Sequence, residues 1–128
     1  MILSETKVGW IGAGKMGFPM SHCLLKSGVE ICVSDPDERQ VKKLVNEGAQ
    51  AGSTNISVAS ETDVVISMIP NDAALRDVVF GELGIFSVMK SNSIYIDMST
   101  VSPEISEEVS NEANNRGIFY LRAPVSGS

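Results

Sequence analysis

Three glycines near the start of the chain have the spacing of a turn that binds the pyrophosphate of a dinucleotide. Gly12, Gly14 and Gly17 form a G-x-G-x-x-G pattern that follows an apolar run and opens a run with helical periodicity. In such a turn the first glycine makes the bend, the second lets the backbone approach the phosphates, and the third lets helix and strand pack closely. The N-terminus of the helix then faces the phosphates with N–H groups and its positive dipole end. The alternative is that these are structural glycines of a domain that binds nothing.

An acidic residue stands where the adenosine ribose of a dinucleotide is expected. Asp35 follows Gly17 by eighteen positions, at the end of the second predicted strand, and its carboxylate would accept hydrogen bonds from ribose hydroxyls. A 2′-phosphate at this place would meet a negative charge, which favours NAD over NADP. Arg39 is the nearby basic residue that would still allow NADP. The alternative role for Asp35 is to initiate the turn before Pro36.

These residues need a sheet whose strands end at one edge. The chain alternates β-rich runs with helical periodicity, which predicts an α/β fold of the Rossmann type. We expect one dinucleotide-binding domain over residues 1–128, with a doubly wound, mostly parallel sheet and helices on both faces. Strands are predicted at Lys7–Ile11, Glu30–Ser34, Gln50–Ser53, Val64–Ile69, Ser93–Asp97 and Ile118–Leu121. Helices are predicted at Lys15–Ser27, from Pro36 to Gly48, and at Asn55–Ser60, Ala73–Phe80, Ile85–Met89 and Pro103–Arg116.

Three later loops should reach the same crevice, because ligands bind outside the carboxyl ends of the strands at the topological switch point. They follow the fourth, fifth and sixth strands at Met68–Asp72, Asp97–Thr100 and Ala123–Gly127. Their hydroxyls and amides suit a ribose, a nicotinamide or a small carboxylate. Ser99 and Thr100 also fit the N-cap region of the helix at Pro103.

Composition restricts the other classes of function. Ten basic against sixteen acidic residues give a net charge of −6, which disfavours a general nucleic-acid surface. Residues 1–5 lack the pattern of a signal peptide, and no apolar run is long enough to span a membrane, so a cytoplasmic location is expected. Cys23 and Cys32 are predicted to be buried, reduced thiols. With His22 as the only histidine and no ligand cluster, no metal site is expected.

Four motifs occur in order along nearly the whole chain. They are Val8–Met20 (VGWIGAGKMGFPM), Ser67–Asn71 (SMIPN), Asp97–Thr100 (DMST) followed by Pro103, and Ala123–Gly127 (APVSG). Together they resemble the β-hydroxyacid dehydrogenases, the superfamily of 3-hydroxyisobutyrate and 6-phosphogluconate dehydrogenases. Arg122 stands where the family has an aspartate, and Ser128 where it has a second glycine, which leaves the identity of the substrate open.

The resemblance implies a role for particular residues. The cofactor would be bound at its pyrophosphate by a turn, at its adenosine ribose by one acidic residue, along its length by a loop, and near its nicotinamide ribose by a threonine. In that order, these residues are Gly12, Ala13, Gly14, Lys15, Met16 and Gly17; Asp35; Met68, Ile69, Pro70 and Asn71; and Thr100. Ser126 and Gly127 would bind the substrate. The family's catalytic lysine is expected beyond Ser128, so no catalytic residue is assigned here. Lys90 precedes the fifth strand and does not match that position.

The resemblance therefore implies an NAD(P)-binding domain of an oxidoreductase. Such an enzyme transfers a hydride between the nicotinamide and a small β-hydroxyacid or semialdehyde. The helical C-terminal domain of the family, which forms its dimer, is absent from these 128 residues. We expect them to be inactive alone and the full-length form to be a homo-oligomer. The alternatives are a non-catalytic dinucleotide-binding or interaction module, and an imine reductase of the same superfamily.

Overall fold

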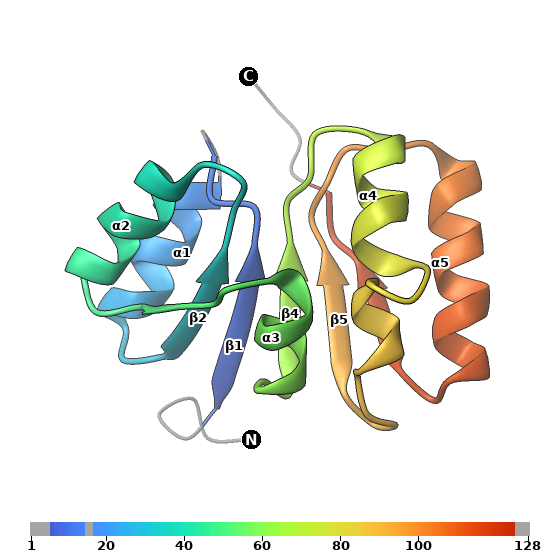
Figure 1. Cartoon of the computed structure of the whole chain (residues 1–128). Coiled ribbons are helices and arrows are strands. Elements are labelled where there is room, and N and C mark those ends of the chain that lie inside the picture. The colour runs from blue at the N-terminus through green and yellow to red at the C-terminus, as the bar shows by residue number, and fades with distance from the viewer. Residues whose placement is uncertain (1–5, 15–16, 125–128) are drawn as a thin grey trace.

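The computed structural model describes residues 6–14 and 17–124 and shows a single six-stranded sheet with the order β3-β2-β1-β4-β5-β6 (Figure 1). The strands are β1 (Lys7–Ile11), β2 (Glu30–Ser34), β3 (Gln50–Ala51), β4 (Val64–Ser67), β5 (Ile94–Asp97) and β6 (Phe119–Arg122). The helices are α1 (Gly17–Lys26), α2 (Glu38–Asn46), α3 (Asn55–Ser60), α4 (Asp72–Val79), the 3₁₀ helix η2 (Ile85–Ser87) and α5 (Pro103–Asn115).

The order of the strands makes the sheet doubly wound. The chain proceeds outward from β1 to β3, returns to pair β4 with the other side of β1, and proceeds outward again to β6. All five pairings are parallel, and Trp10 of β1 lies opposite Val33 of β2 and Ile66 of β4. The predicted fold class is confirmed. The direction of winding changes between β1 and β4, which is where such sheets bind their ligands.

Helices cover both faces of the sheet, as predicted. One apolar core gathers Trp10 and Val33 from the sheet and Leu44 from α2, and α1 packs against it through Leu24 and Leu25. The other core joins the opposite face of the sheet to α3, α4, η2 and α5. In Figure 1 the α1 and α2 pair lies to the left, while α4 and α5 lie to the right. The central strands are therefore buried on both sides, which explains their nearly continuous apolar sequences.

Strand β6 is less covered than its neighbours. The side chains of Phe119 and Leu121 are 61% and 58% exposed, although both are large and apolar. Tyr120 lies on the opposite face and packs against the core beneath α5. Within the described residues, no helix is long and apolar enough to cross a membrane.

Some predicted boundaries differ from those observed because side-chain bonds set the ends of the elements. The fourth strand ends at Ser67 instead of Ile69, and the Ile69 N–H donates to the Ser99 hydroxyl. The second helix begins after Asp37, whose carboxylate accepts the Arg39 N–H. The segment predicted as helical over Ile85–Met89 is a single 3₁₀ turn.

The prediction that both cysteines are buried is half wrong. Cys32 is 2% exposed in the centre of the sheet, but Cys23 is exposed. The buried side of α1 is formed by Gly17 and Ser21, which are one turn apart. Cys23 follows Ser21 by two positions, which is about 200° around a helix, and therefore faces the opposite side.

Candidate functional site

The three glycines of the first turn are needed for different reasons. Gly12 has a φ of +97°, and a Cβ on it would overlap the backbone carbonyl of Met68. A Cβ on Gly17 would overlap the carbonyl of Gly12. Both glycines are therefore required by the fold itself, which explains two thirds of the motif without any ligand.

Gly14 has no such explanation within the protein. Among the described residues, and apart from its chain neighbours, a Cβ at this position would meet no atom within 4 Å, and Gly14 is not among the glycines with positive φ. Its residue type is therefore not imposed by packing or by backbone conformation. The open space beside an exposed backbone at the start of α1 fits the close approach of a phosphate group, which a Cβ would impede. The residues present thus fit a dinucleotide.

The turn is held in place by the strands beneath it. The Trp10 indole Nε1–H donates to the Gly12 carbonyl at 2.9 Å, and this side chain is 1% exposed. The Gly12 N–H donates to the Ser34 carbonyl at 3.0 Å, which ties the turn to the end of β2. These two bonds fix Gly12, the first residue of the turn, without any ligand.

Asp35 lies directly beside the glycine turn, as its position in the sequence predicted. Its carboxylate accepts the Ala13 N–H at 2.6 Å through Oδ2 and the Asp37 N–H at 2.7 Å through Oδ1. The second bond closes the turn around Pro36, so Asp35 also has the turn-forming role that the sequence offered as an alternative. Asp35 thus shapes the loop after β2 and also places a negative charge next to the turn.

Arg39, the cation that would allow NADP, is paired with a different carboxylate. Its Nε and Nη2 donate to the two oxygens of Asp37 at 3.1 and 3.2 Å. This bonding lowers the pKa of Asp37 below its usual value. The loop after β2 therefore presents the carboxylates of Asp35 and Asp37 and the paired guanidinium of Arg39.

The loops after β4 and β5 meet the glycine turn and each other. The Met68 carbonyl lies against Gly12, and the Ile69 N–H donates to the Ser99 hydroxyl at 2.6 Å. A second bond between these loops joins the Ser102 N–H to Asp72 Oδ1 at 2.9 Å. The carboxyl ends of four strands are thereby joined in one continuous edge.

In the loops after β4 and β5, the exposed residues among the predicted contacts are Pro70, Asn71 and Thr100. Asn71 also caps α4, since its Oδ1 accepts the Ala74 N–H at 2.9 Å. The capping role considered for Ser99 and Thr100 is wrong, because Ser102 caps α5. The remaining predicted residues, Lys15, Met16, Ser126 and Gly127, lie outside the described part of the chain.

A buried polar cluster beneath these loops was not predicted. We call it the Asp97 network, and it consists of Ser67, Tyr95, Asp97 and Ser99. All four residues are at most 1% exposed. Burial, and then the charge of Asp97, raise the pKa of Tyr95 well above its usual value. The available signal was a serine and an aspartate ending two otherwise apolar strands, since buried polar groups require partners.

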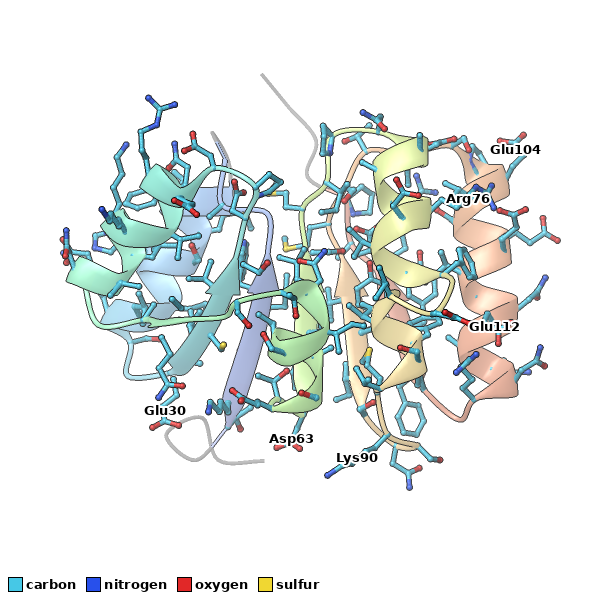
Figure 2. All side chains as sticks on the ribbon, in the orientation of Figure 1. Glu30, Asp63, Arg76, Lys90, Glu104 and Glu112 are labelled. Atoms are coloured by element: carbon cyan, nitrogen blue, oxygen red, sulfur yellow. The ribbon has the colours of Figure 1, made fainter. Side chains whose placement is uncertain are left out.

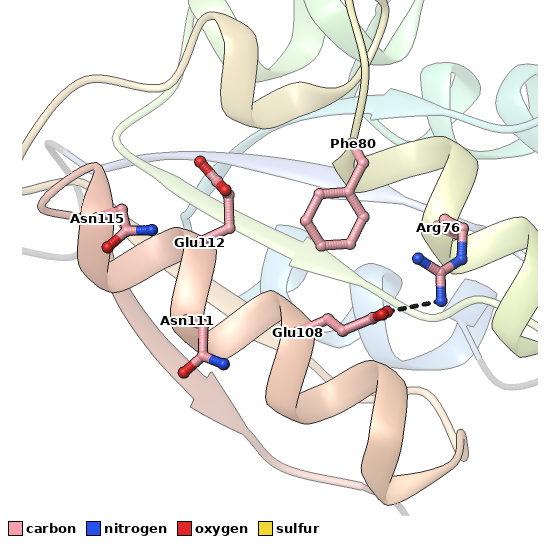
Figure 3. A pocket seen from close by; sticks show the side chains of 6 residues that line it. All are labelled: Arg76, Phe80, Glu108, Asn111, Glu112 and Asn115. Atoms are coloured by element: carbon pink, nitrogen blue, oxygen red, sulfur yellow. Dashed lines mark ion pairs between the residues drawn. The ribbon is translucent and has the colours of Figure 1, made fainter.

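Two features lie away from this edge. Figure 2 shows Lys90 at the lower end of the sheet, where Glu30 opens β2, so it lies at the opposite edge from the glycine turn. A shallow groove between α4 and α5 contains an ion pair between Arg76 and Glu108, at 2.6 Å (Figure 3). Among the described residues, no group of three His, Cys, Asp or Glu side chains could hold a metal.

The doubly wound sheet and the glycine turn at its switch point define a dinucleotide-binding domain of the α/β class. The comparison with protein families is more specific. The model described as the NAD binding domain of 6-phosphogluconate dehydrogenase matches residues 7–128. The chain belongs to this family, and it is an NAD(P)-binding domain.

Individual relatives agree with this assignment. The 2-(hydroxymethyl)glutarate dehydrogenase of Eubacterium barkeri is 40% identical over 121 residues, which are 94% of this chain and 40% of that protein. The structure of 3-hydroxyisobutyrate dehydrogenase from Mycobacterium tuberculosis, solved with L-serine, superposes with a TM-score of 0.85 at 30% identity, covering 96% of this chain and 41% of that one. A protein named cytokine-like nuclear factor N-PAC, from Danio rerio, is 34% identical over 98% of this chain and 27% of its own length.

The chain therefore spans less than half of the length of each of these relatives, from 27% to 41%.

Proposed function

We propose that this domain binds NAD at the carboxyl edge of its sheet and serves an oxidoreductase acting on a small β-hydroxyacid or semialdehyde. Gly14 carries the proposal, because the fold explains Gly12 and Gly17 but gives no reason for a glycine at position 14. The turn would hold the pyrophosphate through backbone N–H groups at the start of α1. When bound, NAD supplies the hydride acceptor for oxidation of the substrate alcohol.

The family resemblance suggests the other contacts, and the location of the described residues at this edge supports them. Asp35, beside Ala13, would accept hydrogen bonds from the adenosine ribose hydroxyls. The loop over Met68, Ile69, Pro70 and Asn71 would line the cofactor, and Thr100 would lie near the nicotinamide ribose. Ser126 and Gly127, which lie outside the described residues, would bind the substrate, as the family resemblance implies.

NAD is preferred over NADP on electrostatic grounds. A 2′-phosphate next to Asp35 would place two negative charges together, and Arg39 is already bonded to Asp37. We expect NADH to bind more tightly than NADPH. Replacing Asp35 with asparagine, which removes the charge and keeps an acceptor oxygen, should narrow the difference in Kd between the two cofactors.

Titration of the purified domain with NADH, followed by the fluorescence of the dihydronicotinamide, tests the binding. We expect a saturable change in fluorescence with 1:1 stoichiometry. A signal that stays linear up to millimolar NADH and NADPH would contradict the proposal. For the activity, the test is turnover of a panel of β-hydroxyacids by the full-length protein, because the proposed catalytic lysine lies beyond Ser128.

A second candidate is a dinucleotide-binding module without catalysis. The observation in its favour is the similarity to N-PAC, which is named as a nuclear factor and not as a dehydrogenase. Under this alternative the full-length protein would bind NADH as proposed but would turn over none of the β-hydroxyacids or semialdehydes in the panel.

A further inference from the structure

The start of the loop that follows β4 is bonded to one side chain of the neighbouring loop. Ile69 lies two residues beyond the end of β4, and its N–H donates to the Ser99 hydroxyl at 2.6 Å. Ile69 is 9% exposed and packs in the core, so its N–H is not satisfied by bulk water. This bond holds the backbone immediately before Pro70 and Asn71, which are exposed at the candidate cofactor edge.

The hydrogen atoms of the Asp97 network fix which group donates in each bond. A serine hydroxyl has one hydrogen, and Ser99 donates it to Asp97 Oδ1 at 2.6 Å. Its oxygen is therefore an acceptor toward the Ile69 N–H. Ser67 likewise donates to Asp97 Oδ1 at 2.8 Å, so Tyr95 must donate to Ser67 at 2.6 Å.

The carboxylate is the end of both chains of hydrogen bonds. Asp97 is 0% exposed, and its Oδ1 accepts from Ser67, from the Ser99 hydroxyl and from the Ser99 N–H at 3.2 Å. Oδ1 is thus the common acceptor at which both chains end. It therefore holds the Ser99 hydroxyl in the orientation that leaves its oxygen open to the loop.

We propose that Asp97 and Ser99 are positioning residues that hold the loop after β4 in the conformation that receives the dinucleotide. This inference rests on the proposed function, and it assigns to these residues no contact with cofactor or substrate. If the loop is ordered in only a fraction of the molecules, the apparent Kd rises by the inverse of that fraction. Loss of the Ser99 bond should therefore weaken binding while the fold is retained.

The network offers a matched control. Ser99→Ala and Tyr95→Phe each remove one buried hydroxyl from the same cluster, but only Ser99 is bonded to the loop. A merely structural role would make the two variants alike. We expect Ser99→Ala to raise the Kd for NADH roughly tenfold, as when the ordered loop falls to about a tenth of the molecules. Tyr95→Phe should leave the Kd within about twofold of the wild type on the same reasoning.

Amide hydrogen exchange at Ile69, without any cofactor, gives a second readout. Exchange should accelerate in Ser99→Ala and remain slow in Tyr95→Phe, after both are corrected for their change in global stability. If Ser99→Ala does not fold, Asp97→Asn takes its place, because it keeps the shape of the side chain but replaces the carboxylate, which only accepts hydrogen bonds, by a neutral amide with one acceptor oxygen and a donating NH2 group. It should show the same pair of effects.

Each result has one meaning. Equal changes in Kd for Ser99→Ala and Tyr95→Phe, or unchanged exchange at Ile69 in Ser99→Ala or its substitute, overturn the positioning role and leave the proposed NAD site intact. Failure of the wild type to bind NADH overturns the proposed function, and with it the positioning role.

Discussion

Substituting each glycine of the turn with alanine separates the needs of the fold from those of the ligand. Gly12→Ala combines a positive φ, which costs about 1–2 kcal/mol, with an overlap on the Met68 carbonyl, which costs about 1–3 kcal/mol. Gly17→Ala has the overlap alone. The Cβ of Gly14→Ala meets no atom of the other described residues, and Gly14 does not have a positive φ. The substitution should therefore leave stability unchanged or raise it by up to about 1 kcal/mol.

Gly14→Ala should have the opposite effect on binding: it keeps the stability of the fold but weakens the affinity for NADH. Its alanine methyl group would occupy the space proposed for the pyrophosphate and would displace a phosphate oxygen from a backbone N–H. A hydrogen bond to a charged group contributes about 1.5–3 kcal/mol, so the Kd for NADH should rise roughly 10- to 100-fold. We expect Gly14→Ala to be as stable as the wild type and to bind poorly.

Urea unfolding gives the stabilities and NADH fluorescence gives the affinities of the three variants. Saturating NADH should raise the Tm of the wild type by linkage and should raise that of Gly14→Ala much less. The reasoning is refuted if Gly14→Ala binds NADH as tightly as the wild type. It is also refuted if Gly14→Ala is as destabilised as Gly12→Ala, because the glycine would then have a structural explanation.

Two further predictions concern groups with shifted pKa values. The hydrogen bonds from Ser102 lower the pKa of Asp72 below 3.8, so its contribution to stability is present above that pH and is lost as the pH falls through the lowered value. Asp72→Ala should therefore unfold at lower urea than the wild type at pH 7, and the gap should narrow at pH 3; a constant gap would argue against the bond. Burial raises the pKa of the Cys32 thiol. A thiol reagent such as DTNB should therefore modify Cys23 in the native protein and Cys32 only after unfolding. Rapid modification of both cysteines in the native protein would contradict the buried position of Cys32.

The sheet could be predicted from the sequence because its strands are short apolar runs bounded by glycine, proline or aspartate. The glycine turn and Asp35 could also be predicted, because their spacing along the chain fixes their place in a βαβ unit. The error at Cys23 arose from the angular phase of a helix whose buried side is formed by small residues, which apolar periodicity does not reveal.

The Asp97 network could not be predicted because its members come together only in the folded sheet. Tyr95 follows Ser67 by 28 positions, and the two hydroxyls meet across β4 and β5. The cap of α5 at Ser102 was missed because three hydroxyl residues precede the helix, and only the structure shows that Ser99 is occupied by Asp97 and Ile69. The local sequence shows which residues could cap the helix, and the tertiary contacts decide which of them does.

The position of the cofactor can be measured directly by mapping amide chemical shifts of the ¹⁵N-labelled domain as NAD is added. We expect the largest changes at Ala13, Gly14, Asp35 and Thr100, all at the carboxyl edge of the sheet. Shifts confined to the groove around Arg76 and Glu108, or no shifts at millimolar NAD, would contradict a dinucleotide site at the glycine turn.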